Sequence, residues 1–287
     1  MVSAPSASRS KIVVRHEKIY ALSLHYPDKP QHPYPVILFI PGWGSVHYED
    51  YQTLIDFLVR QGNIVLFAPE YANEYGTKKM RQAFDNMYRL SSMRAYMDIT
   101  RLGVVGHSSG GGKAFDVYRY FREKGWGQNG SFIFAMAPWF AFDMGSKDLQ
   151  SLPPDMYVMI ELFGNDQTTD PRIPMTIYSL LTGIPADHKT FYIYPDVGHN
   201  YPTGEGNASK IKGVVEPLKA LMHTAFKDRN ASFATYDKLG SDAPWQTYRH
   251  MIAPSQNYPS KCRPNSAKIA KALAAYDIDY CGVFVQN

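Results

Sequence analysis

The sequence has few cysteines, no long apolar run and no run of charges of one sign. Its two cysteines, Cys262 and Cys281, are too few for a disulfide scaffold, so either one bond joins them or both are reduced thiols. The longest apolar stretches have only the length of a strand, so no integral membrane segment is expected. The 30 basic and 26 acidic residues are scattered and give a net charge of +4, so nucleic-acid binding is not expected either.

The chain does have enough apolar residues to build a large core. Of its 287 residues, 45% are hydrophobic and 20% are charged, a balance typical of one large α/β domain or of a domain with an appendage. Aromatic residues make up 14% and include 21 tyrosines, a composition common in proteins that handle apolar or sugar-like surfaces. Nothing in the sequence predicts the oligomeric state.

The first residues, Met1 to Ser8, are mostly small and lack the apolar core of a signal peptide. They resemble the start of a mature secreted chain with an added methionine, although a disordered native N-terminus has the same composition. We therefore expect a secreted or periplasmic protein, with a cytoplasmic location as the alternative.

Short apolar runs alternate with amphipathic stretches along most of the chain. Runs of this length are typical of buried strands, and their alternation with helices predicts an α/β fold with a doubly wound, mostly parallel sheet. The expected strands are 11–15, 19–26, 36–40, 64–68, 102–105, 132–136, 156–163 and 190–194, and the expected helices are 51–60, 79–97, one starting near 110, 175–181 and 214–226.

The last expected helix of this series would complete one domain over residues 1–228. Residues 229–287 then form a C-terminal extension, with an alanine-rich helix over 266–276 between the two cysteines. We expect the extension to pack on the domain, either as a small appendage or as a lid or clasp at the functional edge of the sheet.

A serine flanked by glycines lies where a strand passes into a helix. The segment Gly106-His107-Ser108-Ser109-Gly110 follows an apolar run and opens a helical stretch. Side chains two positions before and after the serine would collide as strand and helix fold back on each other, which explains glycine there. The pattern predicts a nucleophile elbow that exposes Ser108 at the sheet edge. A serine hydroxyl alone is a weak nucleophile, so a base, an acid and an oxyanion site are also needed.

Two later loops carry an acid and a base. In a parallel sheet the carboxyl ends of the strands meet at one edge, and Asp166 and His199 each follow an expected strand. His199 would take the Ser108 proton, because the pKa of imidazole lies nearest neutrality, and Asp166 would orient the ring.

Other acids and histidines compete for these roles. Asp170 is the competing acid, and Asp196 is a poorer one because it lies only three residues before the histidine that it would orient. His107 precedes the serine inside the elbow, and His188 precedes its strand and so belongs to the opposite edge. Taken alone, Asp166 is more typical of a turn and His199 of the surface, and their positions directly after expected strands are what favour catalytic roles.

The expected oxyanion site consists of two backbone N–H groups. Ser109, which follows the nucleophile, supplies one of them. The turn Pro41-Gly42-Trp43-Gly44 follows the first buried strand and supplies the other, from Trp43 or alternatively from Gly44. An ordinary glycine-rich turn has the same composition.

Together these motifs resemble the α/β-hydrolase fold, and within it the cutinase-like polyester hydrolases and triacylglycerol lipases. The order Ser108, Asp166, His199 is the order of the triad in that fold. The resemblance covers roughly residues 36–201. The matching segments are Pro41-Gly42-Trp43, Gly110-Gly111-Gly112, Ala137-Pro138-Trp139, Asn165-Asp166 and His199-Asn200-Tyr201-Pro202.

This resemblance implies a serine esterase that needs no cofactor and no metal and acts on small or polymeric esters. Trp43, Trp139 and Tyr201 would line the substrate site and favour apolar or aromatic esters, although Trp139 is equally typical of a core residue. In that family the chain closes soon after the helix that follows the histidine, often with a disulfide, whereas the candidate pair here, Cys262 and Cys281, lies in the added extension. The alternatives are a peptidase or thioesterase with the same triad, or a hydrolase-like binding protein without activity.

Overall fold

The computed structural model describes residues 12–19, 22–70, 75–194, 196–204, 208–228 and 267–280. Cys262, Cys281 and most of the extension over 229–287 lie outside the described residues. The strands are β1 Val14–Ile19, β2 Leu22–Pro27, β3 Tyr34–Ile40, β4 Ile64–Phe67, β5 Met97–His107, β6 Ser131–Met136, β7 Tyr157–Phe163 and β8 Lys189–Tyr194. The α-helices are α1 Gln52–Arg60, α2 Lys78–Leu90, α3 Ser109–Glu123, α4 Ser146–Gln150, α5 Arg172–Leu180, α6 Lys212–Phe226 and α9 Ala267–Leu273. Short 3-10 turns are η1 Tyr48–Tyr51, η2 Ser92–Tyr96, η3 Ala186–His188, η4 Tyr201–Thr203 and η5 Ala208–Ile211.

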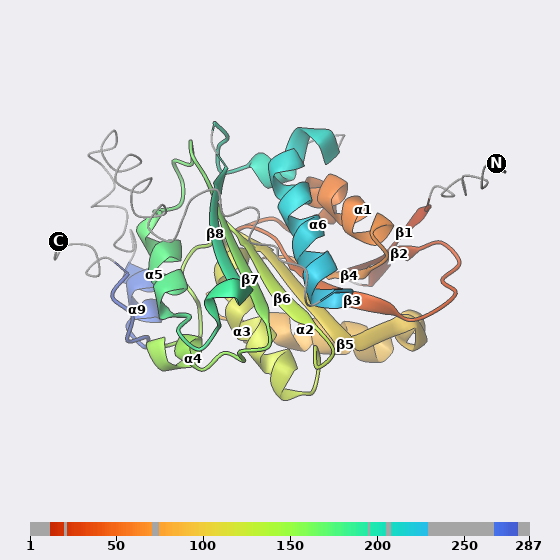
Figure 1. The fold of residues 1–287 in the computed structure, drawn as a ribbon, viewed down its shortest axis with the longest axis horizontal. Coiled ribbons are helices and arrows are strands. Elements are labelled where there is room, and N and C mark those ends of the chain that lie inside the picture. The colour runs from red at the N-terminus through yellow and green to blue at the C-terminus, as the bar shows by residue number, and fades with distance from the viewer. Residues whose placement is uncertain are drawn as a thin grey trace, which may run out of the picture.

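The strands form one sheet in the order β1-β2-β4-β3-β5-β6-β7-β8 (Figure 1). β2 pairs antiparallel with both β1 and β4, whereas all other neighbours are parallel. The predicted doubly wound, mostly parallel sheet is confirmed, and it has an antiparallel hairpin at one edge.

Helices cover both faces of this sheet (Figure 1). On one face, α2 and α3 bury Phe84 and Phe115, and on the other, α1 and α6 bury Leu54 and Leu218. Successive residues of β3 alternate between these two apolar clusters. A strand that is buried on both sides needs apolar residues at every position, which explains its continuous apolar run.

The prediction of one helix over 79–97 is correct up to Leu90 and wrong after it. α2 ends at Leu90, and the backbone of Ser91 is extended. The Ser91 side chain accepts the Met93 N–H, and η2 begins at the next residue. β5 then begins at Met97, well before the expected strand, because its first residues continue the parallel pairing with β3 across a register shift at Pro35.

The described part of the extension packs against the segment that follows β6. The Tyr280 ring lies 4.9 Å from that of Phe140, and its hydroxyl accepts the Ala141 N–H over 3.0 Å. Tyr276 donates to Asp143 over 2.6 Å. Residues 267–280 therefore complete the apolar core on this side of the molecule. Within the described residues, no helix is long and apolar enough to cross a bilayer.

Candidate active site

Ser108 lies at the junction between β5 and α3 in a strained backbone conformation. Its φ of 55° and ψ of −121° are unusual for a residue with a side chain. Its N–H donates to Met136 on β6 over 2.8 Å, and its carbonyl accepts the Trp139 N–H over 2.8 Å. The surrounding backbone thus holds the serine in the expected elbow.

The glycines of the elbow are required by close backbone contacts. A Cβ at Gly106 would lie 2.3 Å from the Gly110 carbonyl oxygen, and one at Gly110 would lie 2.3 Å from the carbonyl oxygens of Ile40 and Pro41. At Gly112 it would lie 1.9 Å from the Phe140 oxygen. The collision expected between strand and helix therefore involves main-chain atoms, which cannot move aside as a flexible side chain can.

Asp166 and His199 are hydrogen-bonded. His199 Nδ1 lies 2.8 Å from Asp166 Oδ2, and both side chains are largely buried. The other carboxylate oxygen, Oδ1, accepts the N–H groups of Thr168 and Thr169 over 2.7 and 3.0 Å. These contacts fix the carboxylate, so the imidazole is held with Nδ1 protonated and Nε2 free to accept a proton.

The competing acids have other contacts. Asp170 accepts three side-chain hydrogen bonds from Arg172, from Nε to Oδ1 over 2.9 Å and to Oδ2 over 3.1 Å, and from Nη2 to Oδ2 over 2.5 Å. Asp196 is exposed in a turn with a φ of 62°. His188 contacts the Pro154 carbonyl at the amino end of β8, which is the opposite edge of the sheet. The geometry thus favours Asp166 as the partner of His199.

A hydrogen-bonded chain links the elbow to two other loops. The Gly42 N–H donates to the Tyr51 hydroxyl over 2.9 Å, and the Tyr51 hydroxyl lies 2.7 Å from His107 Nδ1. His107 Nε2 lies 2.9 Å from the His199 carbonyl oxygen. Since that oxygen only accepts, Nε2 carries the proton and Nδ1 accepts from Tyr51. Burial and the neighbouring His199 lower the pKa of His107 to about 3, so this ring is neutral.

These hydrogen bonds link the turn after β3, the serine elbow and the loop that carries His199. The rings of His107 and His199 have centroids 4.7 Å apart, and a Cβ at Gly42 would lie 3.5 Å from Ser108 Cβ. Among the described residues, Ser108 Oγ makes no hydrogen bond, either with His199 or with another side chain. Such contacts are often long in free enzymes and shorten when substrate binds.

The turn after β3 has a free N–H at the expected place. The Gly42 N–H is bound to Tyr51, whereas the Trp43 N–H has no backbone acceptor in the described part of the chain. Gly44 has a φ of 79°, which turns the chain away after Trp43. The Trp43 N–H therefore stays the expected second oxyanion donor, together with the Ser109 N–H in the first turn of α3.

A buried ion pair lies beneath this first turn. Lys113 Nζ lies 2.6 Å from Glu70 Oε1, and each side chain is 1% exposed. The Ser109 hydroxyl donates to the same oxygen over 2.9 Å. The pair ties α3 to the loop after β4 and anchors the residue whose N–H is expected to face the oxyanion.

Three further residues near the site, Thr169, Tyr51 and Glu70, were not predicted from the sequence. Thr169 Oγ1 lies 3.3 Å from His199 Nδ1 and donates to the Ala137 carbonyl over 3.2 Å. Its position three residues after Asp166 was the available signal. Tyr51 resembled an ordinary amphipathic helix residue, and Glu70 lacked any local motif.

The three expected substrate-binding aromatic residues differ in exposure. Trp43 is 38% exposed and its ring lies 4.9 Å from that of Tyr75. Trp139 is half-buried and packs on Phe140 at 5.1 Å. The Tyr201 hydroxyl accepts the Gly213 N–H over 3.1 Å, so internal contacts occupy this side chain. Of the three, only Trp43 stands well clear of the core.

The strand order, the serine elbow and the Asp166–His199 pair define the α/β-hydrolase fold, and the chain has this fold. A thermostable esterase from Pseudomonas putida is similar, with a TM-score of 0.57 and 18% identity over 77% of this chain and 86% of its own. A variant of an esterase called rPPE, in complex with (S)-Ac-CPA, has a TM-score of 0.57 and 18% identity over 78% of this chain and 86% of that one. No family model and no curated protein matches the sequence.

Proposed function

We propose that the protein is a serine hydrolase that cleaves carboxylic esters through an acyl-enzyme. The observation that carries this proposal is the 2.8 Å contact between Asp166 Oδ2 and His199 Nδ1, in the loops beside the strained Ser108. A protein that only binds a ligand needs none of these groups together. The esterases that share the fold agree with this chemistry.

In the first half of the reaction, Ser108 Oγ attacks the ester carbonyl carbon and His199 Nε2 takes its proton. Asp166 stabilises the imidazolium through Nδ1–H. The carbonyl oxygen becomes negative and accepts the N–H groups of Trp43 and Ser109. When the carbon–oxygen bond breaks, Nε2 returns the proton to the leaving alcohol.

In the second half, water replaces the alcohol. His199 Nε2 removes a proton from the water as its oxygen attacks the acyl carbon, and the same two N–H groups stabilise the second oxyanion. The bond to Ser108 Oγ then breaks, and Nε2 returns the proton to this oxygen. The acid is released and the triad is restored, with no net change in its protonation.

We propose that the substrates are apolar or aromatic esters, either small or polymeric. The Trp43 side chain is exposed, its ring packs against that of Tyr75, and its own backbone N–H is a proposed oxyanion donor. Aromatic faces of this kind pack well on acyl chains and aryl groups. The cutinase-like or lipase-like specificity rests on the motif resemblance together with this exposed ring.

The test is a panel of esters of graded chain length and bulk, including an insoluble polyester, assayed with the wild type and Ser108→Ala. We expect Ser108→Ala to abolish turnover of short p-nitrophenyl esters with a nearly unchanged Tm, because the serine hydroxyl binds no described side chain. Substantial residual turnover would reject the nucleophile. Faster cleavage of a matched thioester or peptide would reject the ester preference.

A further inference from the structure

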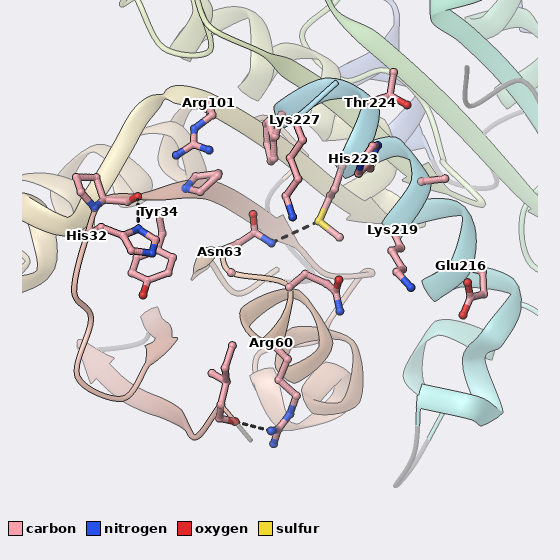
Figure 2. A pocket seen from close by; sticks show the side chains of 18 residues that line it. His32, Tyr34, Arg60, Asn63, Arg101, Glu216, Lys219, His223, Thr224 and Lys227 are labelled. Atoms are coloured by element: carbon pink, nitrogen blue, oxygen red, sulfur yellow. Dashed lines mark hydrogen bonds between the residues drawn. The ribbon is translucent and has the colours of Figure 1, made fainter. Parts of the chain in front are cut away.

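A pocket lies at the edge of the sheet opposite the candidate active site (Figure 2). It has a volume of about 720 Å³, which is within the range of small-molecule sites. Its floor is built by Tyr34 at the start of β3 and Asn63 before β4, and its walls by the end of α1 and by α6. We call it the basic pocket.

The basic pocket has an excess of positive charge. Arg60, Arg101, Lys219 and Lys227 line it, against the single carboxylate of Glu216. In Figure 2 the ammonium groups of Lys219 and Lys227 point from α6 toward the space above α1. These two lysines form no ion pair with any described side chain. Like charges that converge in a concave site repel one another and raise the local potential.

Helix dipoles explain only part of this arrangement. Arg60 and Lys227 lie at the carboxyl ends of α1 and α6, where a cation is favourable in itself. Lys219 lies about two turns before the end of α6, and Arg101 lies on a strand and pairs with Asp98 over 2.6 Å. The charge of Lys219 therefore faces the pocket without serving a helix end, whereas Asp98 balances part of the charge of Arg101.

We propose that the basic pocket binds an organic polyanion whose charges are carboxylates or phosphates. The cationic side chains attract the anionic groups, and the guanidinium groups of Arg60 and Arg101 can form paired hydrogen bonds to a carboxylate or a phosphate. The apolar surfaces of Tyr34, Met222 and Phe226 line the same space and suit a carbon skeleton.

This site is independent of the proposed hydrolase chemistry. β3 runs for 7 residues between Tyr34 in the basic pocket and the Gly42 turn, a separation of about 20 Å. A ligand in the basic pocket would therefore not touch Ser108 or His199.

The experiment measures Tm at low ionic strength against rising concentrations of citrate, glucose 6-phosphate and neutral glucose. We expect at least one of the two anions to raise Tm in a saturable manner, because it binds the folded protein and relieves repulsion between the cations. Glucose should have no effect. A response to citrate alone assigns carboxylates, and a response to glucose 6-phosphate alone assigns phosphates.

Two exposed lysines of α6 and Lys227, which directly follows it, supply matched variants. Lys219→Gln and Lys227→Gln should each raise the anion concentration needed for half of the maximal Tm increase about fivefold. Lys212→Gln lies on α6 but outside the pocket, so it should leave this concentration unchanged. The proposal is overturned if neither anion gives a saturable rise in Tm. It is also overturned if glucose acts equally, or if Lys212→Gln weakens the response as much as Lys219→Gln.

Discussion

His107 donates a hydrogen bond from Nε2 to the carbonyl oxygen of His199 over 2.9 Å. The residue before the proposed nucleophile thus holds the backbone of the proposed base. Tyr51 fixes the other side of the His107 ring, and the same hydroxyl binds the turn that leads to Trp43. One buried phenol and one neutral imidazole therefore position three loops together.

Tyr51→Phe should lower both stability and kcat. It leaves the Gly42 N–H and His107 Nδ1 without a partner, which costs about 2–4 kcal/mol in the free energy of unfolding. Tyr118→Phe is the matched control, because the partner of that buried hydroxyl in the described part of the chain is Ser131, at the start of β6 and away from the site. It should cost about 1 kcal/mol and leave kcat unchanged. Equal kcat values in the two variants would argue against a positioning role for Tyr51.

Asp166→Asn and Asp170→Asn should separate catalysis from stability. Asp166→Asn removes the acceptor that orients His199 and should lower kcat about 10³- to 10⁴-fold with a modest change in Tm. Asp170→Asn breaks the buried pair with Arg172 and should mainly lower Tm. Steady-state kinetics and thermal unfolding measure both effects, and the reverse pattern would move the acid to Asp170.

Gly106→Ala should destabilise the protein by about 3 kcal/mol or more. The new Cβ would lie 2.3 Å from a carbonyl oxygen of α3, and neither backbone can move without displacing the elbow. Gly198→Ala is the control, because its Cβ would have its nearest neighbour at 3.8 Å and its φ is ordinary. Denaturant unfolding of both variants tests the contrast, and a stable Gly106→Ala protein would contradict the elbow packing.

Lys113→Met should destabilise the protein more than the double variant Glu70→Gln/Lys113→Met. The single change removes the Lys113 ammonium from the buried Glu70 carboxylate, at a cost of about 3–5 kcal/mol. The double variant removes both charges, so part of that cost is regained. A double-mutant cycle on the free energy of unfolding measures this coupling, and additive losses would show that the ion pair is not a unit.

Glu161→Gln should stabilise the protein increasingly as pH rises. Glu161 is fully buried in β7, its two carboxylate oxygens have no partner among the described residues, and burial raises its pKa well above 4.5. Above pH 4.5 the unfolded chain loses this proton and the folded chain keeps it, so wild-type stability falls as pH rises. Glutamine does not titrate.

The Tm difference between Glu161→Gln and the wild type should therefore be small near pH 4.5 and larger at neutral pH. Glu123→Gln, at the exposed end of α3, serves as the control. A difference that stays constant with pH would show that the carboxyl of Glu161 does not titrate on unfolding.

The sheet and the Asp166–His199 pair could be predicted because both depend on local patterns. Continuous apolar runs identify strands buried on two faces, and loops after parallel strands must meet at one edge. Glycines at 106 and 110 could be predicted for a related reason, since the strand-to-helix turn leaves no room for a Cβ.

The supporting contacts could not be predicted, because they join residues that are distant in the sequence. Tyr51 and His107 are 56 positions apart, and neither belongs to a motif that names the other. The buried Lys113 required a counter-ion, but Glu70 lies 43 positions away and only the packed structure identifies it. The end of α2 was missed because Ser91 caps a new turn by its own side chain.

The contact between Ala141 and Tyr280 has a consequence during synthesis. The two residues are 139 positions apart, so a ribosome adding about 5–20 residues per second needs roughly 7–28 s to make the second after the first. Throughout that interval the Phe140 ring lacks its contact with Tyr280. This side of the core is therefore completed only when nearly the whole chain has been made.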